Sequence, residues 1–122
     1  MVKKILIADA DPSRRTLLRA TLQDPRYEII EASGGVQALA LRERHRPDLV
    51  ILDEAMPGVS GMEVCRAIKR DRGAGNTPVI LLTEQETSTA IGEAGPDVFL
   101  PKPYSPLRLL EAVEKLLSQA EG

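Results

Sequence analysis

Five short apolar runs that alternate with segments of helical periodicity limit, more than any other feature, what this chain can fold into. The runs lie at residues 5–8, 27–31, 49–52, 79–82 and 98–100. Most are apolar at nearly every position, which is typical of strands buried on both faces of a parallel sheet. Because right-handed crossovers join consecutive parallel strands, the alternation predicts a doubly wound five-stranded parallel sheet with five helices on its two faces.

Capping residues mark where the first and last helices begin. Asp11 and Pro12 predict the start of a helix over 13–23. Ser105 and Pro106 predict the start of the last helix in the same way. The stripe of the first helix that we expect to face the core comprises Leu17, Leu18, Thr21 and Leu22. The corresponding stripe of the last helix comprises Leu109, Leu110, Val113, Leu116 and Leu117.

The helices between them are less sharply marked. The second follows Gly35, and the residues that we expect it to turn inward are Val36, Leu39 and Ala40. The third ends near residue 69, and the residues of its apolar face are Met62, Cys65 and Ile68. The fourth, over 84–93, has the weakest pattern because the segment is mostly polar.

Length and charge suit a single domain over residues 1–122. With 18 acidic and 16 basic side chains the formal net charge is −2, so no basic field exists to attract nucleic acid or an anionic membrane. One cysteine excludes an internal disulfide framework, and no apolar run is long enough to span a membrane, so we expect a cytoplasmic location. The polar residues 118–122 are either the end of the domain or the start of a linker.

Chemistry-bearing residues follow most of the apolar runs. Asp9 and Asp11 come after the first run, Asp53 after the third, Thr83 after the fourth and Lys102 after the fifth. Parallel strands end at the same edge of a sheet, so we expect these side chains to converge on one site. Crowded carboxylates repel each other, so one must be protonated or a hard cation must neutralise them, and oxygen ligands without His or Cys favour Mg²⁺. A carboxylate beside Mg²⁺, a hydroxyl and an ammonium group is suited to attack on phosphorus.

The segments around these residues, taken in order, resemble the response-regulator receiver family. They lie at 5–9, 47–53 with 56–58, 79–83 and 99–103. The resemblance implies a flavodoxin-like fold with strand order 2-1-3-4-5, and phosphorylation of Asp53 by a histidine kinase or phosphotransfer protein. It implies a switch hydroxyl at Thr83, a switch aromatic at Phe99 and a phosphate-pairing lysine at Lys102. It further implies a cis peptide between Lys102 and Pro103.

The same resemblance implies a set of Mg²⁺ ligands, and here the sequence departs from the family. The implied ligands are Asp9, Asp53 and the backbone carbonyl of Ala55. The second acid of the family's acidic pair is Ala10 here, and Glu84 replaces the small residue that follows the switch threonine in most relatives. We hypothesise that Glu84, or as the weaker alternative Asp11, returns the carboxylate that Ala10 removes. Loss of that ligand without replacement would weaken Mg²⁺ binding.

We therefore expect a phosphorylation-controlled binding module and not an enzyme. It would signal to a downstream protein target or to a C-terminal output domain, with no direct contact to nucleic acid or membrane. The alternative is a pseudo-receiver that binds partners without phosphorylation, because Ala10 removes a metal ligand and Glu84 crowds the site. An aspartyl-phosphate hydrolase would need a second carboxylate two residues after Asp53, where the chain has Ala55.

Other conspicuous residues have a simpler structural interpretation. Arg14, Arg15 and Arg19 give the first helix a basic face, which we interpret as solvated, with docking of a kinase as the alternative. Cys65 is expected to pack as a small apolar side chain. His45 complements the dipole at the end of its helix.

Overall fold

In the computed structural model five parallel strands form one sheet, and the structure describes residues 2–71, 76–84 and 89–121. The strands are β1 (Lys3–Ala8), β2 (Tyr27–Ala32), β3 (Leu49–Asp53), β4 (Val79–Thr83) and β5 (Val98–Pro101). The helices are α1 (Pro12–Thr21), α2 (Gly35–His45), α3 (Gly61–Arg70), α4 (Thr89–Ala94) and α5 (Pro106–Glu121). The strand order is β2-β1-β3-β4-β5, as the resemblance implied.

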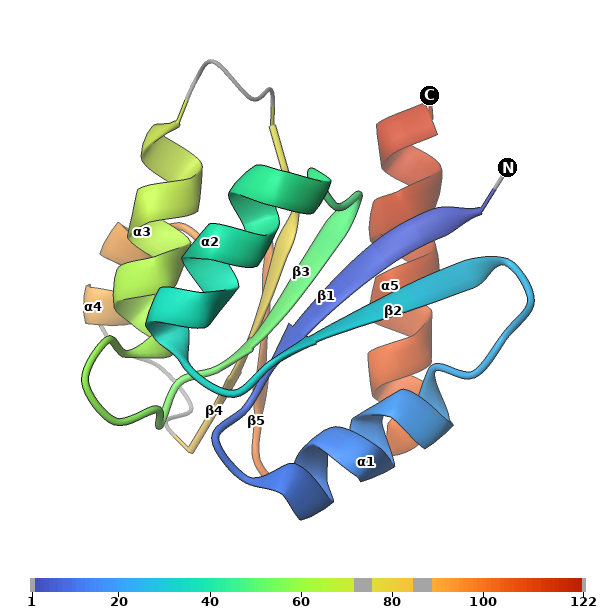
Figure 1. Ribbon diagram of the computed structural model, residues 1–122, viewed down its shortest axis with the longest axis horizontal. Helices are drawn as coiled ribbons and strands as arrows, with labels where there is room; N and C mark the ends of the chain where they lie inside the picture. Colours follow the sequence, from blue (N-terminus) through green and yellow to red (C-terminus); the bar gives the residue numbers. More distant parts are fainter. Residues whose placement is uncertain (1, 72–75, 85–88, 122) are drawn as a thin grey trace.

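Helices cover both faces of this sheet, as Figure 1 shows. α1 and α5 lie on one face, and α2, α3 and α4 lie on the other. Successive strand residues point to opposite faces, so each buried strand contributes to two cores. Leu6 and Leu81 belong to the core beneath α2, α3 and α4. Ile7 and Ile80 belong to the core beneath α1 and α5. The apolar runs of the sequence are thus explained by burial on both sides.

Side-chain caps confirm the predicted starts of two helices. Asp11 Oδ1 accepts a hydrogen bond of 2.9 Å from the backbone N–H of Ser13, and Pro12 is the first residue of α1. Just before α5, Ser105 Oγ accepts a hydrogen bond of 3.1 Å from the backbone N–H of Arg108. The cap at Asp11 therefore lets α1 begin at Pro12, shortly after β1 ends at Ala8.

The predicted inward face of α2 is wrong at two positions. Val36 is 70% exposed and Ala40 is also exposed, whereas Ala38 and Arg42 are buried. The cause is the close packing of Gly35, where a Cβ atom would lie 2.4 Å from the carbonyl oxygen of Val59. With Gly35 held against that loop, the positions three and seven residues later point inward and Val36 points to solvent.

The predicted stripe of α1 is also too wide. Leu18 and Leu22 are buried, but Leu17 is 68% exposed. α5 covers much of the same face of the sheet, so α1 buries only a narrow stripe. The stripe of α5 is confirmed, with Leu109 and Val113 fully buried.

Two further predictions concern less regular parts of the chain. A helix is present in the weakly patterned segment as α4, although residues 85–88 of that prediction lie outside the described residues. α5 continues to Glu121, so residues 118–121 are helical.

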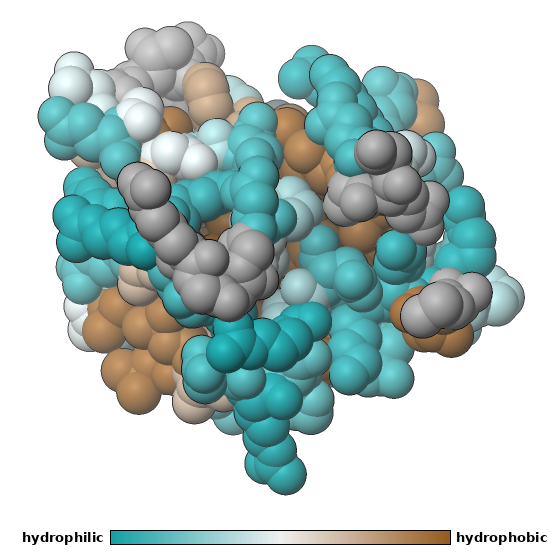
Figure 2. All heavy atoms as spheres, turned by 90° about the horizontal axis from the view of Figure 1, so that it is seen from above, coloured by the Kyte–Doolittle hydropathy of each residue, from teal (hydrophilic) through white to brown (hydrophobic). Residues whose placement is uncertain are grey.

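The helices among the described residues are all too short or too polar to cross a membrane. Figure 2 shows the face seen from above, where hydrophilic side chains cover most of the surface and hydrophobic ones show in smaller areas between them.

Candidate functional site

The carboxyl ends of four strands bring together the residues that the sequence places there. Asp9 follows β1, Asp53 ends β3, Thr83 ends β4 and Lys102 follows β5. Asp9, Asp53 and Thr83 are at most 2% exposed, although their residue types are usually found at the surface. Such burial of polar groups is costly unless the groups are paired, so the contacts of each one matter.

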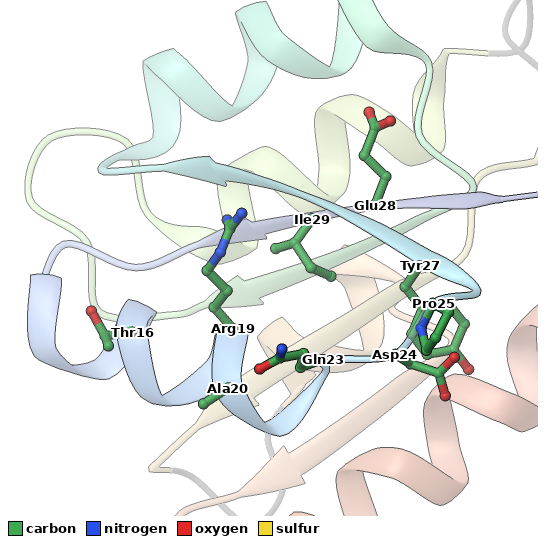
Figure 3. Close-up of a pocket in the computed structure, with 9 residues that line it drawn as sticks. All are labelled: Thr16, Arg19, Ala20, Gln23, Asp24, Pro25, Tyr27, Glu28 and Ile29. Atoms are coloured by element: carbon green, nitrogen blue, oxygen red, sulfur yellow. The ribbon is translucent and has the colours of Figure 1, made fainter.

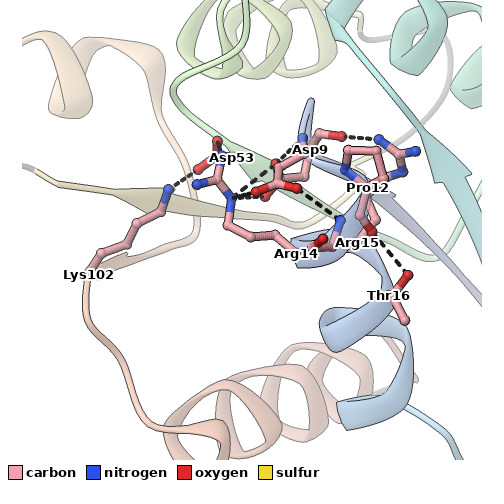
Figure 4. A network of polar contacts seen from close by, with 9 residues as sticks. Asp9, Pro12, Arg14, Arg15, Thr16, Asp53 and Lys102 are labelled. Carbon is pink, nitrogen blue, oxygen red and sulfur yellow. Dashed lines mark hydrogen bonds and ion pairs between the residues drawn. The ribbon is translucent and has the colours of Figure 1, made fainter.

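Asp53 is fully buried, yet only one of its carboxylate oxygens has a hydrogen-bond partner among the described residues. The ammonium group of Lys102 donates to Oδ1, while Oδ2 lies 3.7 Å from Nη2 of Arg14 (Figure 4). Burial raises the pKa of the Asp53 carboxyl above its ordinary value, although the hydrogen bond and charge of Lys102 oppose that rise. Because Oδ2 accepts no hydrogen bond among the described residues, Asp53 is open to a cation or to an electrophile.

A close backbone approach holds Asp53 in place. Gly61, the first residue of α3, lies so near that a Cβ atom there would be 2.4 Å from the carbonyl oxygen of Asp53. The backbone N–H of Gly61 donates 3.1 Å to the carbonyl oxygen of Glu54. Only a residue without a side chain allows α3 to begin this close to the end of β3.

Asp9 is tied to the start of α1 through both its side chain and its backbone. Its Oδ1 accepts a hydrogen bond of 2.8 Å from the backbone N–H of Asp11. Its backbone carbonyl accepts one of 2.7 Å from Nη1 of Arg15. Arg14 Nε lies 3.3 Å from Oδ1 and 3.1 Å from Oδ2 of the same carboxylate. Asp9 is therefore held in a fixed orientation against the start of α1.

Arg14 lies on the basic face that the sequence indicates, with its side chain 50% exposed, and it also belongs to the site. Its guanidinium group contacts Asp9 and lies within ion-pair distance of Asp53, as Figure 4 shows. The side-chain hydrogen bond to Asp9 raises the pKa of the guanidinium group. A cation in the first turn of a helix opposes the helix dipole, but the sequence does not show which carboxylates pair with it.

Thr83 has an acidic partner that the sequence analysis did not name. Its hydroxyl donates a hydrogen bond to the carboxylate of Glu54, the residue after Asp53. Both side chains line a hollow of about 480 Å³ that Lys102 and Glu84 also line. Glu84 itself is exposed. No sequence pattern signals the Glu54 contact, because it depends on how two strand ends face each other.

The segment after β5 has the geometry that the resemblance implied. The peptide bond between Lys102 and Pro103 is cis. Phe99 is half-buried on β5 and packs against the core beneath α2, α3 and α4. Burial raises the pKa of the Tyr104 hydroxyl, which also lies near the negative charges of Asp9 and Asp53.

The oxygen donors of the site fit a hard cation such as Mg²⁺, because two carboxylates meet at a buried edge and Asp53 Oδ2 has no hydrogen-bond partner among the described residues. The described residues contain no group of three or more His, Cys, Asp or Glu side chains placed to hold a metal ion. Asp11 serves as the cap of α1, and Glu84 is exposed. That either one supplies the missing ligand stays a prediction.

Two other hollows adjoin α1. The first, of about 1040 Å³, lies between α1 and the edge strand β2, and Figure 3 shows the residues that line it, among them Thr16, Arg19 and Ile29. The second, of about 250 Å³, lies between α1 and the start of α5, and Leu17 and Tyr104 line it beside Lys102. Asp53 lines neither of them.

Comparison with known proteins gives a consistent result. The family model of the response regulator receiver domain matches residues 5–114. The alkaline phosphatase synthesis transcriptional regulatory protein PhoP of Bacillus subtilis is 36% identical over 124 residues, covering 99% of this chain and 51% of PhoP. The transcriptional regulatory protein ResD of the same organism is 40% identical over 120 residues, covering 96% of this chain and 49% of ResD. The chain spans about half the length of these curated relatives.

Solved structures share the fold over nearly the whole chain. Chemotaxis protein CheY4 of Vibrio cholerae has a TM-score of 0.84 and 32% identity, over 95% of this chain and 99% of that one. The signal receiver domain of a signal transduction histidine kinase from Syntrophus aciditrophicus has a TM-score of 0.88 and 31% identity, over 97% of this chain and 92% of that one.

Proposed function

The chain belongs to the response regulator receiver family, and we propose that it is a phosphorylation-dependent switch of two-component signalling whose phosphoacceptor is Asp53. The observation that carries this proposal is the state of the Asp53 carboxylate. It is buried at the end of β3, Lys102 holds one oxygen, and the other has no hydrogen-bond partner among the described residues. A held, partly open carboxylate is what nucleophilic attack on phosphorus requires.

The phosphoryl donor is a phosphohistidine of a histidine kinase or phosphotransfer protein. Asp53 Oδ2 forms the new bond to phosphorus as the bond from phosphorus to the imidazole nitrogen breaks, and the imidazole leaves with the electron pair. Lys102 offsets negative charge on the phosphoryl oxygens. When bound by Asp9, Asp53 and the carbonyl of Ala55, Mg²⁺ supplies further positive charge there.

The response to phosphorylation runs through Thr83. Its hydroxyl donates to Glu54 in the present structure, and a phosphoryl group on Asp53 would offer it a more strongly charged acceptor. Movement of Thr83 away from Glu54 frees space toward β5, where Phe99 is only half-buried and can turn inward. The surface around Phe99 would then bind the downstream partner.

The output lies in another protein or in a further domain. The relatives PhoP and ResD are described as transcriptional regulatory proteins and are about twice the length of the matched region. A receiver of this kind acts by binding rather than by turning over a small substrate, and we place it in the cytoplasm, where a kinase can reach it.

A pseudo-receiver is the second candidate, and a specific observation favours it. Ala10 contributes no metal ligand, and Arg14 already lies between Asp9 and Asp53. If these features block phosphoryl transfer, the domain would bind its partner constitutively through the same fold.

Phosphorylation by a small-molecule donor separates the candidates. The domain is incubated with phosphoramidate and Mg²⁺, and its intact mass is measured. We expect one added phosphoryl group on the wild type and on Asp24→Asn, which changes an aspartate on the α1–β2 loop, and none on Asp53→Asn. A folded wild type that gains no mass would contradict the proposal and support the pseudo-receiver.

A further inference from the structure

The two buried carboxylates of the site already have a cation between them. Asp9 and Asp53 are both acidic, and such a pair ordinarily needs either a neutralising cation or protonation of one carboxylate. Arg14 Nε lies 3.1 Å from Asp9 Oδ2, and its Nη2 lies 3.7 Å from Asp53 Oδ2, as seen in Figure 4. We propose that Arg14 is an internal counter-cation that bridges the two carboxylates and competes with Mg²⁺ for them.

The guanidinium group of Arg14 contacts this pair, although its side chain is half exposed. Its Nε also lies 3.3 Å from Asp9 Oδ1 and 3.9 Å from Asp11 Oδ2, so three carboxylates surround one guanidinium group. A guanidinium group is planar and presents donors on two sides, which lets it face two carboxylates at once. Asp53 Oδ2 is buried without a hydrogen-bond partner in the described chain, and Arg14 lies within ion-pair distance of it, while Lys102 pairs with Oδ1.

The position of Arg14 in the fold supports this role. It is the third residue of α1, whose first turn contains no acidic residue, and the helix dipole disfavours a cation there. The helix therefore gains nothing from the charge, and the favourable partners are the carboxylates. Its side chain is 50% exposed, so the guanidinium group can swing into solvent when another cation arrives.

Ala10 also weakens the binding of Mg²⁺ at this site. Mg²⁺ finds one carboxylate fewer at this edge, and it must also displace the guanidinium group of Arg14. The free domain is thus charge-compensated without metal, and Mg²⁺ binds weakly. This inference concerns the site of the proposed function, but its test requires no phosphoryl transfer.

Mg²⁺ titration of the domain in solution, followed by amide NMR shifts at Asp53 and Thr83, tests the competition. Arg14→Gln keeps a polar side chain and removes the charge, and we expect it to bind Mg²⁺ at least about tenfold more tightly than the wild type. Arg19→Gln is the matched control, because it removes the same charge from the same helix, where Arg19 pairs with Glu31 at 2.7 Å. We expect that control to stay within about twofold of the wild type. Equal or weaker Mg²⁺ binding by Arg14→Gln overturns the proposal.

Thermal unfolding gives a second readout that does not depend on NMR assignments. In EDTA we expect the wild type to melt at the same temperature as in Mg²⁺, whereas Arg14→Gln melts higher in Mg²⁺ than in EDTA. If Arg14→Gln folds only with Mg²⁺, the same melt records it and supports the proposal.

The outcomes separate this inference from the proposed function. If the wild type accepts no phosphoryl group but Arg14→Gln binds Mg²⁺ more tightly, the phosphoacceptor role of Asp53 is refuted and the role of Arg14 is supported. If the wild type is phosphorylated but Arg14→Gln binds Mg²⁺ no more tightly, only the role of Arg14 is refuted.

Discussion

Replacing Asp53 by Asn removes a buried negative charge while keeping the size of the side chain and an oxygen that accepts from Lys102. In the wild type one carboxylate oxygen lacks a hydrogen-bond partner among the described residues, and the like-charged Asp9 is buried at the same edge. A buried charged group short of a partner costs about 1–3 kcal/mol. Loss of the ion pair with the partly exposed Lys102 offsets about 1 kcal/mol of that gain. We therefore expect the free energy of unfolding of Asp53→Asn to be higher, by up to roughly 2 kcal/mol.

Thermal and urea unfolding in EDTA measure this difference, with circular dichroism as the probe because the chain has no Trp. For a domain of this size the expected rise in Tm is up to roughly 8 °C. The exposed Glu28 on β2 provides the control, since Glu28→Gln removes a charge without burial and should leave Tm unchanged. An Asp53→Asn variant that is less stable than the wild type at neutral pH would refute the reasoning.

The same comparison has a defined dependence on pH. The pKa of the Asp53 carboxyl is raised in the folded state, so the folded wild type takes up a proton at a higher pH than the unfolded chain does. The penalty of the buried charge therefore fades as pH falls through that raised pKa. The stability gap between Asp53→Asn and the wild type should be largest at neutral pH and should narrow in acid. A gap that widens in acid would contradict the assigned direction.

Three further changes test the packing of the fold. Gly61→Ala places a methyl group against the carbonyl of Asp53 and should lower the free energy of unfolding, measured in urea, by about 1–3 kcal/mol. Gly92→Ala is the control, because its methyl group meets open space in α4 and should not lower that free energy. Equal effects would refute the close approach. Burial raises the pKa of the Cys65 thiol to about 11, so at pH 8 a disulfide reagent should modify it only as fast as the domain unfolds, and immediate reaction would contradict its burial. Arg46 ends α2 with a φ of 49°, so Arg46→Gly should raise Tm, with a stability gain of about 0.5–1 kcal/mol, and a lower Tm would contradict backbone strain there.

The fold and the strand-end residues could be predicted because each depends on local pattern and a general rule of topology. Apolar runs mark buried strands whatever surrounds them, and parallel strands must end at one edge. Asp9, Asp53, Thr83 and Lys102 therefore come together from their positions after the runs alone. The capping residues of α1 and α5 are local signals of the same kind.

What the sequence did not predict depends on contacts between elements. The rotation of α2 follows from the close packing of Gly35 against Val59. These residues lie in different segments, and no local pattern predicts their contact. The reach of Arg14 across to Asp53 depends on where α1 begins relative to β3. The partner of Thr83 depends on how the end of β4 faces Glu54. In each case the residue type was visible in the sequence and its partner was not.

The most direct test of the switch uses beryllofluoride, a mimic of the phosphoryl group, added to the domain in Mg²⁺ while amide NMR shifts are recorded. The proposed function predicts shifts at Asp53, Thr83 and Lys102 that extend to Phe99, and it predicts that Asp53→Asn shows none of them. Wild-type spectra that the mimic leaves unmoved at saturating Mg²⁺ would contradict a phosphorylation switch at Asp53.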